Sequence, residues 1–274
     1  MDQFFIRFPD FKKKAVTLSY DDGVIQDRQV VRLLNEHGMK GSFNLNSSSL
    51  LDPDTVTGSR PRLTAEEAIL LYDGHEIAVH SLTHPFLTQL PANRATWEVL
   101  KDRQNLETLF HRIVRGMAYP MGHFDDALVR ILENCGIVYA RTTVSSRGFD
   151  LPSDWLRLQP TCHHDDPELP SLCEQFLALD YPYDSKLFCL WGHGYEFDEN
   201  DNWDVLERFL DRMGGRNDIW YATGIDICEY MRTAGSLQLS ADGRIVFNPS
   251  ATEVFLEYHG KEIVIRPAET LYLP

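Results

Sequence analysis

The alternation of hydrophobic and amphipathic segments constrains the fold of this chain more than any other feature of its sequence. Alternation of this kind is typical of parallel strands joined by crossover helices. Strands are predicted at residues 15–20, 41–45, 75–79, 115–119, 137–142, 156–161, 186–191 and 218–222. Helices are predicted near residues 30–37, 64–74, 92–111, 124–135, 168–179, 203–213 and 225–233. The pattern therefore indicates the α/β fold class.

Polar residues follow directly after most of the predicted strands. In a (β/α) barrel such strand ends converge on one mouth, where barrel enzymes hold their active sites. An open doubly wound sheet would instead spread them along its edge, so we expect a barrel. The residues in question are Asp21, Asp22, His80, Tyr119, Pro120, Arg141, Cys162, His163, His164, His193 and Thr223.

The chain changes character after about residue 234. Short strands are predicted at 237–240, 244–247, 253–258 and 262–265, with turn signals between them. We therefore expect two domains. Residues 1–233 would form the barrel, and residues 234–274 would form a small antiparallel β appendage.

Charge and composition disfavour several classes of partner. The formal net charge of −15 argues against nucleic acid and against anionic membrane surfaces. No stretch reaches the roughly 18 uninterrupted apolar residues of a membrane span. The N-terminus lacks the basic start and apolar run of a secretory signal, and the five cysteines contain no C-x-x-C pair. Buried thiols in a reducing compartment are the expectation, and this places the protein in the cytoplasm.

Two short motifs supply the ligand types of a divalent metal site. Asp21-Asp22 offers two carboxylates, and His80 and His84 offer two imidazoles four positions apart. A single helical-type turn would bring both rings to one side. Catalytic zinc sites commonly take three protein ligands of these kinds and keep a position open for water. The alternative is that the histidines are loop residues making ordinary hydrogen bonds.

With these motifs in hand, the chain resembles the polysaccharide deacetylase family, the NodB-like carbohydrate esterases of family 4. The family's T-F-D-D-G motif corresponds to residues 19–23, Ser-Tyr-Asp-Asp-Gly, and its H-[ST]-x-x-H motif to residues 80–84. The resemblance covers roughly residues 12–225 and implies an irregular (β/α) barrel of about seven strands. It also implies that Asp22, His80 and His84 hold the metal and that Asp21 is the general base. Asp21 as an orienting residue outside the ligand set is the alternative.

The resemblance assigns the remaining roles through the later motifs. His193 follows a hydrophobic segment and would be the general acid, unless it is a core histidine packed near Trp191. Leu190 and Trp191 would help line a pocket for the acetyl methyl group. Tyr119 and Pro120 would contact the substrate, and the backbone N–H of Tyr119 would help to hold the oxyanion.

The third and fourth motifs depart from the family pattern. The family reads R-x-P-x-G where this chain has Ala118-Tyr119-Pro120-Met121-Gly122, so the expected arginine is missing. Arg141 or Arg115 could replace it, and Arg141 is also a candidate substrate contact. The fourth motif, which ends in Asp-Trp, is only faintly echoed before residue 156. The chain instead carries His163 and His164, either of which could bind substrate or cap a loop. These departures indicate a divergent branch.

The predicted activity is hydrolysis of the N-acetyl group of an amino sugar in a glycan, an oligosaccharide or a glycan precursor. The predicted cofactor is one divalent ion, with zinc first and cobalt, nickel, iron or manganese as alternatives. The predicted partner is the acetylated carbohydrate, and the sequence does not define the oligomeric state. Two other functions stay open: an O-acetyl carbohydrate esterase, and a sugar-binding homologue without activity. The intact set of Asp21, Asp22, His80, His84 and His193 argues against the second of these.

Overall fold

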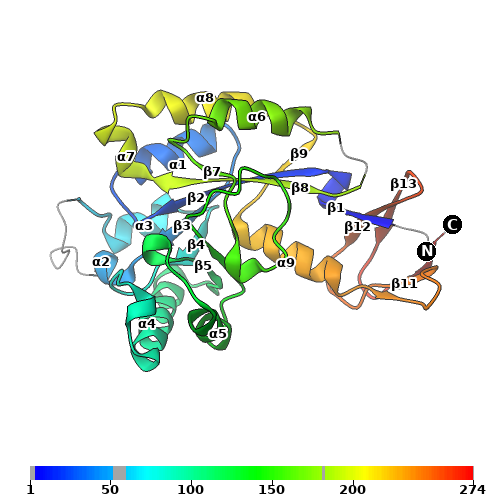
Figure 1. The fold of residues 1–274 in the computed structure, drawn as a ribbon, viewed down its shortest axis with the longest axis horizontal. Helices are drawn as coiled ribbons and strands as arrows, with labels where there is room; N and C mark the ends of the chain where they lie inside the picture. Colours follow the sequence, from blue (N-terminus) through cyan, green and yellow to red (C-terminus); the bar gives the residue numbers. More distant parts are fainter. Residues whose placement is uncertain (1–3, 52–59, 181–182, 274) are drawn as a thin grey trace.

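The main body of the protein is a parallel sheet that curls into a half-barrel and carries helices on its outer side (Figure 1). The computed structural model describes residues 4–51, 60–180 and 183–273. The predicted domains begin at residue 1 and end at residue 274, and residues 1–3 and 274 lie outside the described residues. The strands of this sheet are β2 (Lys14–Asp21), β3 (Gly41–Leu45), β4 (Glu76–Val79), β5 (Gly116–Ala118), β6 (Tyr139–Arg141), β7 (Cys162–His163), β8 (Lys186–His193) and β9 (Ile219–Tyr221).

Strand β2 lies at the centre of the sheet. The strand order is β6-β5-β4-β3-β2-β8-β7, and β9 pairs with the first residues of β2. Every residue of β2 is buried, as expected for a parallel strand covered on both faces. The register between β2 and β8 sets Asp21 directly beside His193. Paired residues of neighbouring strands project to the same face, so the pairing alone brings a carboxylate and an imidazole together.

The helices pack on the sheet through apolar stripes that the sequence predicts. In α1 the buried residues include Val30, Leu33 and Leu34. Helix α3 begins at a capped end, where the Thr64 side chain accepts a hydrogen bond from the backbone N–H of Glu67. The helices are α1 (Asp27–Glu36), α2 (Ser47–Leu51), α3 (Ala65–Leu71), α4 (Ala92–Phe110), α5 (Asp126–Asn134), α6 (Leu169–Ala178), α7 (Gly194–Glu199), α8 (Trp203–Met213) and α9 (Gly224–Gly235).

The strand predicted at residues 156–161 is wrong. This segment begins with a 3-10 turn at Trp155–Arg157, which the Asp154 side chain caps by accepting from the backbone N–H of Leu156. Only Leu158 makes a parallel bridge, to Arg141. Pro160 cannot donate to a strand neighbour, which explains why the ladder does not continue through it. The strand forms only afterwards, as the short β7.

The appendage takes strands from both ends of the chain. One three-stranded sheet joins β1 (Phe4–Arg7), β12 (Val254–Tyr258) and β13 (Lys261–Ile265), and the other joins β10 (Gln238–Leu239), β11 (Ile245–Phe247) and β14 (Thr270–Tyr272). The predicted strands after residue 234 are therefore confirmed. The pairing of β1 with β12 shows that the boundary drawn at residue 234 does not contain the whole appendage.

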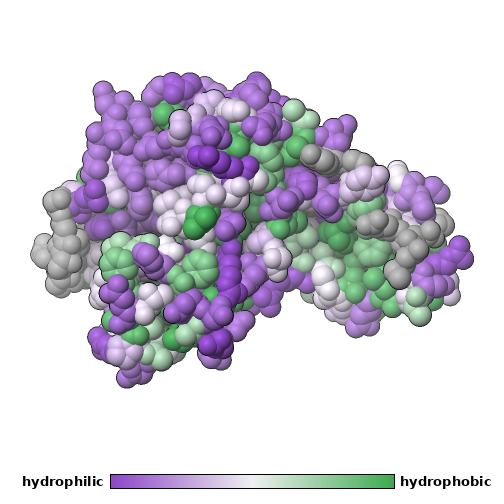
Figure 2. All heavy atoms as spheres, viewed as in Figure 1, coloured by the Kyte–Doolittle hydropathy of each residue, from purple (hydrophilic) through white to green (hydrophobic). Residues whose placement is uncertain are grey.

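Surface polarity differs between the two parts in the view of Figure 2. Hydrophilic residues predominate over the face formed by α6, α7 and α8, and hydrophobic residues gather over the appendage (Figure 2). Within the described ranges, no helix combines the length and the apolar composition needed to cross a bilayer.

Candidate active site

The polar residues that follow the strands meet at one edge of the curled sheet, as the barrel argument predicts. Asp21 ends β2, Arg141 ends β6 and His193 ends β8, while His80 and Tyr119 follow β4 and β5. A cleft of about 960 Å³ opens at this edge. The residues that line it are Asp21, Asp22, Asn46, Ser48, Ser49, Arg60, Arg62, His80, Thr83, His84, Tyr119, Met121, Thr143, Trp191, His193 and Tyr195.

Asp22, His80 and His84 form a compact group of metal-ligand atoms within the cleft. The two Nε2 atoms of His80 and His84 lie 3.1 Å apart. Asp22 Oδ1 lies 3.9 Å from His80 Nε2 and 3.8 Å from His84 Nε2. One carboxylate oxygen and two imidazole nitrogens are a donor set that suits zinc and its neighbours in the periodic table.

Two further observations show that this group fits a divalent metal. Asp22 Oδ1 is buried and has no hydrogen-bond partner among the described residues. The other ring nitrogen of His80, Nδ1, lies 2.9 Å from the carbonyl oxygen of Ala118. That contact places a proton on Nδ1 and leaves the lone pair of Nε2 directed at the site, which is the usual arrangement of a metal-binding histidine.

The backbone of the second motif differs from the expected helical turn. Residues 80–84 form a loop, in which Ser81 (φ 62°) and His84 (φ 58°) adopt left-handed conformations. Asp22 also has a positive φ, of 83°. Positive φ is uncommon outside glycine and concentrates at functional sites. The spacing thus predicts the meeting of the two rings but not the backbone that produces it, because Pro85 disfavours a helical conformation at His84.

Asp21 is buried beside a cation from a distant strand. Arg141 Nη2 donates to Asp21 Oδ1, and Asn44 Nδ2 donates to the same oxygen at 2.8 Å. Burial alone would raise the pKa of Asp21, but Arg141, together with His80 and His193, lowers it to about 2. Arg115 pairs instead with Glu229. Of the two arginines that could replace the missing one, only Arg141 reaches Asp21.

His193 lies between Asp21 and a second carboxylate. Its Nε2 is 3.9 Å from Asp21 Oδ2, and its Nδ1 is 3.2 Å from Glu196 Oε2. Burial lowers the pKa of His193, but Glu196 and Asp21 outweigh burial and raise it above the ordinary value. The surroundings therefore stabilise the ionised form of Asp21 and the protonated form of His193, which is the division that a base and an acid require.

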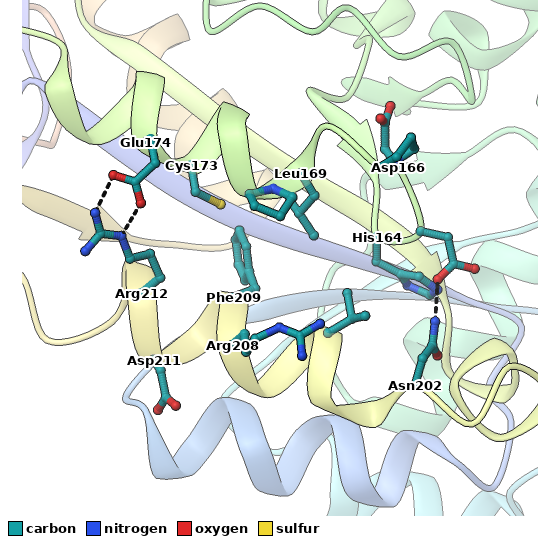
Figure 3. Close-up of a pocket in the computed structure, with 14 residues that line it drawn as sticks. His164, Asp166, Leu169, Cys173, Glu174, Asn202, Arg208, Phe209, Asp211 and Arg212 are labelled. Atoms are coloured by element: carbon teal, nitrogen blue, oxygen red, sulfur yellow. Dashed lines mark hydrogen bonds and ion pairs between the residues drawn. The ribbon is translucent and has the colours of Figure 1, made fainter.

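His163 and His164 lie behind the cleft rather than in its lining. His163 Nε2 is 3.1 Å from Glu196 Oε2. His164 is buried, and burial is the main reason that its pKa falls to about 3. It lines a separate cavity of about 630 Å³ between α6 and α8, near Asn202 (Figure 3). Neither residue is among those that line the cleft, so substrate binding by His163 or His164 stays a prediction.

The other predicted substrate contacts divide in the same way. Tyr119 and Trp191 line the cleft, whereas Pro120, Leu190 and Arg141 are buried and do not line it. The N–H of Tyr119 already donates to the carbonyl oxygen of Arg141, at 3.0 Å. The prediction that this N–H holds an oxyanion is therefore not supported by the geometry.

Some residues of the site were missed because their contacts span long stretches of sequence. Asn44, in the middle of the buried strand β3, supports Asp21, and an amide in a fully buried strand was the available signal. Arg62 Nη1 donates to the backbone carbonyl of Asp22 at 2.5 Å and lies 3.5 Å from its Oδ2. No local pattern marks Arg62. Glu196 lies in the first turn of α7.

The sequence is similar to known polysaccharide deacetylases over its first half. Residues 9–140 match the sequence model of the family described as polysaccharide deacetylase. The curated protein YxkH of Bacillus subtilis (strain 168), assigned to the same family, is 23% identical over 133 residues. The match covers 48% of this chain and 45% of the relative, so it spans less than half of either protein.

Solved structures share the fold at low sequence identity. A Mycobacterium smegmatis protein assigned to the polysaccharide deacetylases has a TM-score of 0.62 and 16% identity, with 84% of this chain and 94% of that chain covered. A Streptomyces lividans family 4 carbohydrate esterase in complex with acetate has a TM-score of 0.51 and 14% identity, with 77% and 93% covered. A mutant of a Bacillus anthracis family 4 pseudoenzyme with restored activity has a TM-score of 0.53 and 17% identity, with 82% and 70% covered.

Proposed function

Because this chain is a NodB-like member of the polysaccharide deacetylase family, we propose that it is a metal-dependent hydrolase that removes the N-acetyl group from an amino sugar. The observation that carries the proposal is the meeting of three features in one cleft. Asp22, His80 and His84 offer metal ligands, Asp21 lies beside them as a buried carboxylate, and His193 lies 3.9 Å from Asp21.

The ligand group would hold one divalent ion, for which we propose zinc. When bound, such an ion supplies Lewis acidity, which polarises an acyl carbonyl and lowers the pKa of water. The carboxylate of Asp21 lies outside the ligand group and is therefore available as a base. Asp21 is bound to Arg141 and Asn44, which hold it ionised and fixed toward the cleft.

Asp21 would take a proton from the attacking water through Oδ2, the oxygen that Arg141 and Asn44 leave free. His193 Nε2 faces the same space and would deliver a proton to the departing nitrogen. An amine is a poor leaving group without that proton, so the acid matters more for an amide than for an ester. The products would be acetate and a free amine on the sugar.

An O-acetyl esterase is the second candidate, because the same base and metal ligands serve ester hydrolysis. The raised pKa of His193 favours the amide reaction, because the departing nitrogen needs a proton from a protonated acid. A homologue without activity would have no use for the ionised Asp21 beside the ligand group. We also propose a cytoplasmic location, which the five free, buried cysteines support.

Acetate release tests the proposal directly. The purified protein would be assayed against N-acetylated sugars, sugar nucleotides and oligosaccharides, together with O-acetylated counterparts, with and without a chelator. We expect release from at least one N-acetylated substrate, loss of release with chelator and recovery on adding zinc. Release from O-acetylated substrates alone would identify an esterase. Release that a chelator leaves unchanged would contradict the metal-dependent mechanism.

A further inference from the structure

A second carboxylate holds His193 at two points. Helix α7 begins directly after His193, and Glu196 lies in its first turn. Glu196 Oε2 accepts a hydrogen bond from the backbone N–H of His193 at 2.9 Å. The same oxygen lies 3.2 Å from Nδ1 of the His193 ring, which is an ion-pair distance without the alignment of a hydrogen bond. A bare ring nitrogen facing a carboxylate oxygen would be repelled, so this contact favours a proton on Nδ1.

His163 approaches the same carboxylate oxygen from β7. Its Nε2 lies 3.1 Å from Glu196 Oε2. Its Nδ1 accepts a hydrogen bond from the backbone N–H of Asp165 at 3.2 Å, so Nδ1 carries no proton. The proton of the neutral ring is then on Nε2 and faces Glu196. A metal bound at Nε2 would require the opposite arrangement, with the proton on Nδ1.

Two glycines allow this arrangement on either side of His193. A Cβ at Gly192 would lie 2.1 Å from Nδ1 of His164, which packs behind the pair. A Cβ at Gly194 would lie 2.8 Å from Oδ1 of Asp27. Both approaches are closer than a side chain allows. The run from Gly192 to Glu196 is thus built for close packing on both sides of the histidine.

We propose that Glu196 and His163 are positioning residues that fix the ring of His193 with its proton on Nδ1 and with Nε2 facing Asp21 and the cleft. Glu196 contacts the ring, and His163 braces Glu196 as a donor. The consequence for catalysis rests on the proposed function, because Nε2 is the atom that would exchange a proton with the substrate. The state of the ring itself does not depend on any substrate.

The charged and titratable groups around His193 are few. Asp21 faces Nε2, and Glu196 faces Nδ1. The rings of His163 and Tyr195 lie 6.5 Å and 5.1 Å from the His193 ring, and Asp22 and His164 interact with it electrostatically. Glu196 is the one carboxylate that touches Nδ1 among the described residues. Removing the Glu196 carboxylate should therefore weaken the preference for a proton on Nδ1 of His193 more than any other single substitution outside the ligand group.

The direct test is the tautomer of His193 in the full-length, zinc-loaded protein. Nitrogen-15 NMR of histidine-labelled protein distinguishes Nδ1–H from Nε2–H rings, and His193→Gln identifies the signal. We expect Nδ1–H in the wild type and loss of this preference in Glu196→Gln. Asp198→Asn is the matched control, since Asp198 lies on α7 but accepts from Gln26 and Trp203 instead. A wild-type ring protonated on Nε2 alone would overturn the inference.

Kinetics provide the second readout. Glu196→Gln should lower kcat for the N-acetyl substrate by about 10–100-fold, in line with the loss of a group that orients a catalytic imidazole. It should also move the alkaline limb of the pH profile to lower pH, because an adjacent negative charge is lost. His163→Phe should lower kcat by a smaller factor. It replaces Glu196→Gln as the test variant if Glu196→Gln does not fold.

Metal content separates this inference from its rivals. One ion per chain in the wild type and in Glu196→Gln supports positioning. Two ions in the wild type and one in Glu196→Gln or His163→Phe would overturn it in favour of a second metal site. If the wild type shows the expected tautomer but releases no acetate from any substrate, the proposed function fails while the positioning of His193 stands.

Discussion

Arg141, at the end of β6, donates through Nη2 to Oδ1 of Asp21, at the end of β2. Its guanidinium carbon also lies 4.5 Å from the centre of the Trp191 ring, so the cation is held between the carboxylate and an aromatic face. Both partners of the ion pair are almost fully buried. The pair places a permanent positive charge beneath the proposed base, on a different strand from the one where the family motif carries its arginine.

Removing this cation should impair the base without removing the metal. In Arg141→Met the pKa of Asp21 should rise, because burial then acts against a smaller opposing charge. The ionised form is the working form of a base, so the acidic limb of the kcat profile should move to higher pH. Kinetics between pH 4 and 9 would measure the shift.

Arg115→Met is the matched control for that substitution. Arg115 pairs with Glu229 and is not close to Asp21. Its removal should leave the profile unchanged. Equal shifts in both variants would indicate a general effect of net charge and would contradict the specific role of Arg141.

Substitutions of the neighbouring residues Asp21 and Asp22 should have different effects on metal content. Asp22→Ala and His80→Ala should lose the bound ion, because each removes one of three ligands. Asp21→Asn should keep the ion while acetate release falls by about 10²–10⁴-fold, the usual contribution of a general base. Elemental analysis and acetate release from the same preparations check both statements. Loss of metal in Asp21→Asn would make Asp21 a ligand.

The sequence predicts those parts of the site that depend on short motifs. The metal ligands lie within motifs of a few residues, and each motif follows a strand whose hydrophobic pattern is clear. The barrel follows from the same pattern. Arg141 and Asp21, in contrast, are 120 positions apart in the sequence, and nothing local to either residue pairs them. The sequence names Arg141 and Arg115 as candidates, and the strand order, which puts β6 and β2 in one curled sheet, decides for Arg141.

The errors have local physical causes. Residues 156–161 are apolar enough for a strand, but Pro160 interrupts the ladder and Asp154 starts a turn. His80 and His84 meet through left-handed residues that the i, i+4 spacing does not reveal. Strand β1 joins the appendage because its partner β12 lies some 250 positions away, as the pairing of Phe4 with Tyr258 shows. Contacts of that range are invisible to any periodicity.

A buried carboxylate at the start of β4, that of Glu76, should make stability depend on pH. Burial raises the pKa of Glu76 to about 7, although Ser42, Ile225 and Tyr139 donate hydrogen bonds to it. The folded state therefore holds a proton that the unfolded chain releases near pH 4.5. The free energy of unfolding should therefore fall as pH rises from about 4.5 to about 7, and Glu76 should cause no further fall above that range.

Glu76→Gln should remove that slope. Urea unfolding at several pH values between 4.5 and 8 would compare the variant with the wild type. Their difference in unfolding free energy should change across this window by about 3 kcal/mol, from about 1.4 kcal/mol per pKa unit. Glu133→Gln, an exposed carboxylate on α5, is the control and should show no such change. A constant difference between wild type and Glu76→Gln would show that Glu76 stays ionised when folded.

His193 distinguishes amide from ester chemistry. An amine leaves only with a proton, whereas an activated phenolate leaves without one. If His193 is the acid, His193→Ala should reduce hydrolysis of an N-acetyl sugar by about 10²–10⁴-fold and largely spare an activated aryl acetate. The alkaline limb of the wild-type profile should lie above the ordinary histidine range, because Glu196 and Asp21 raise the pKa of His193.

That limb should vanish in His193→Ala, since it reports loss of the proton from this ring. Thermal unfolding of the same preparation shows whether the variant is folded. Equal loss on both substrates in a folded variant would point to substrate placement in place of proton donation. A large fall in Tm together with equal loss would identify His193 as a packing residue beside Trp191, whose ring centre lies 5.8 Å away.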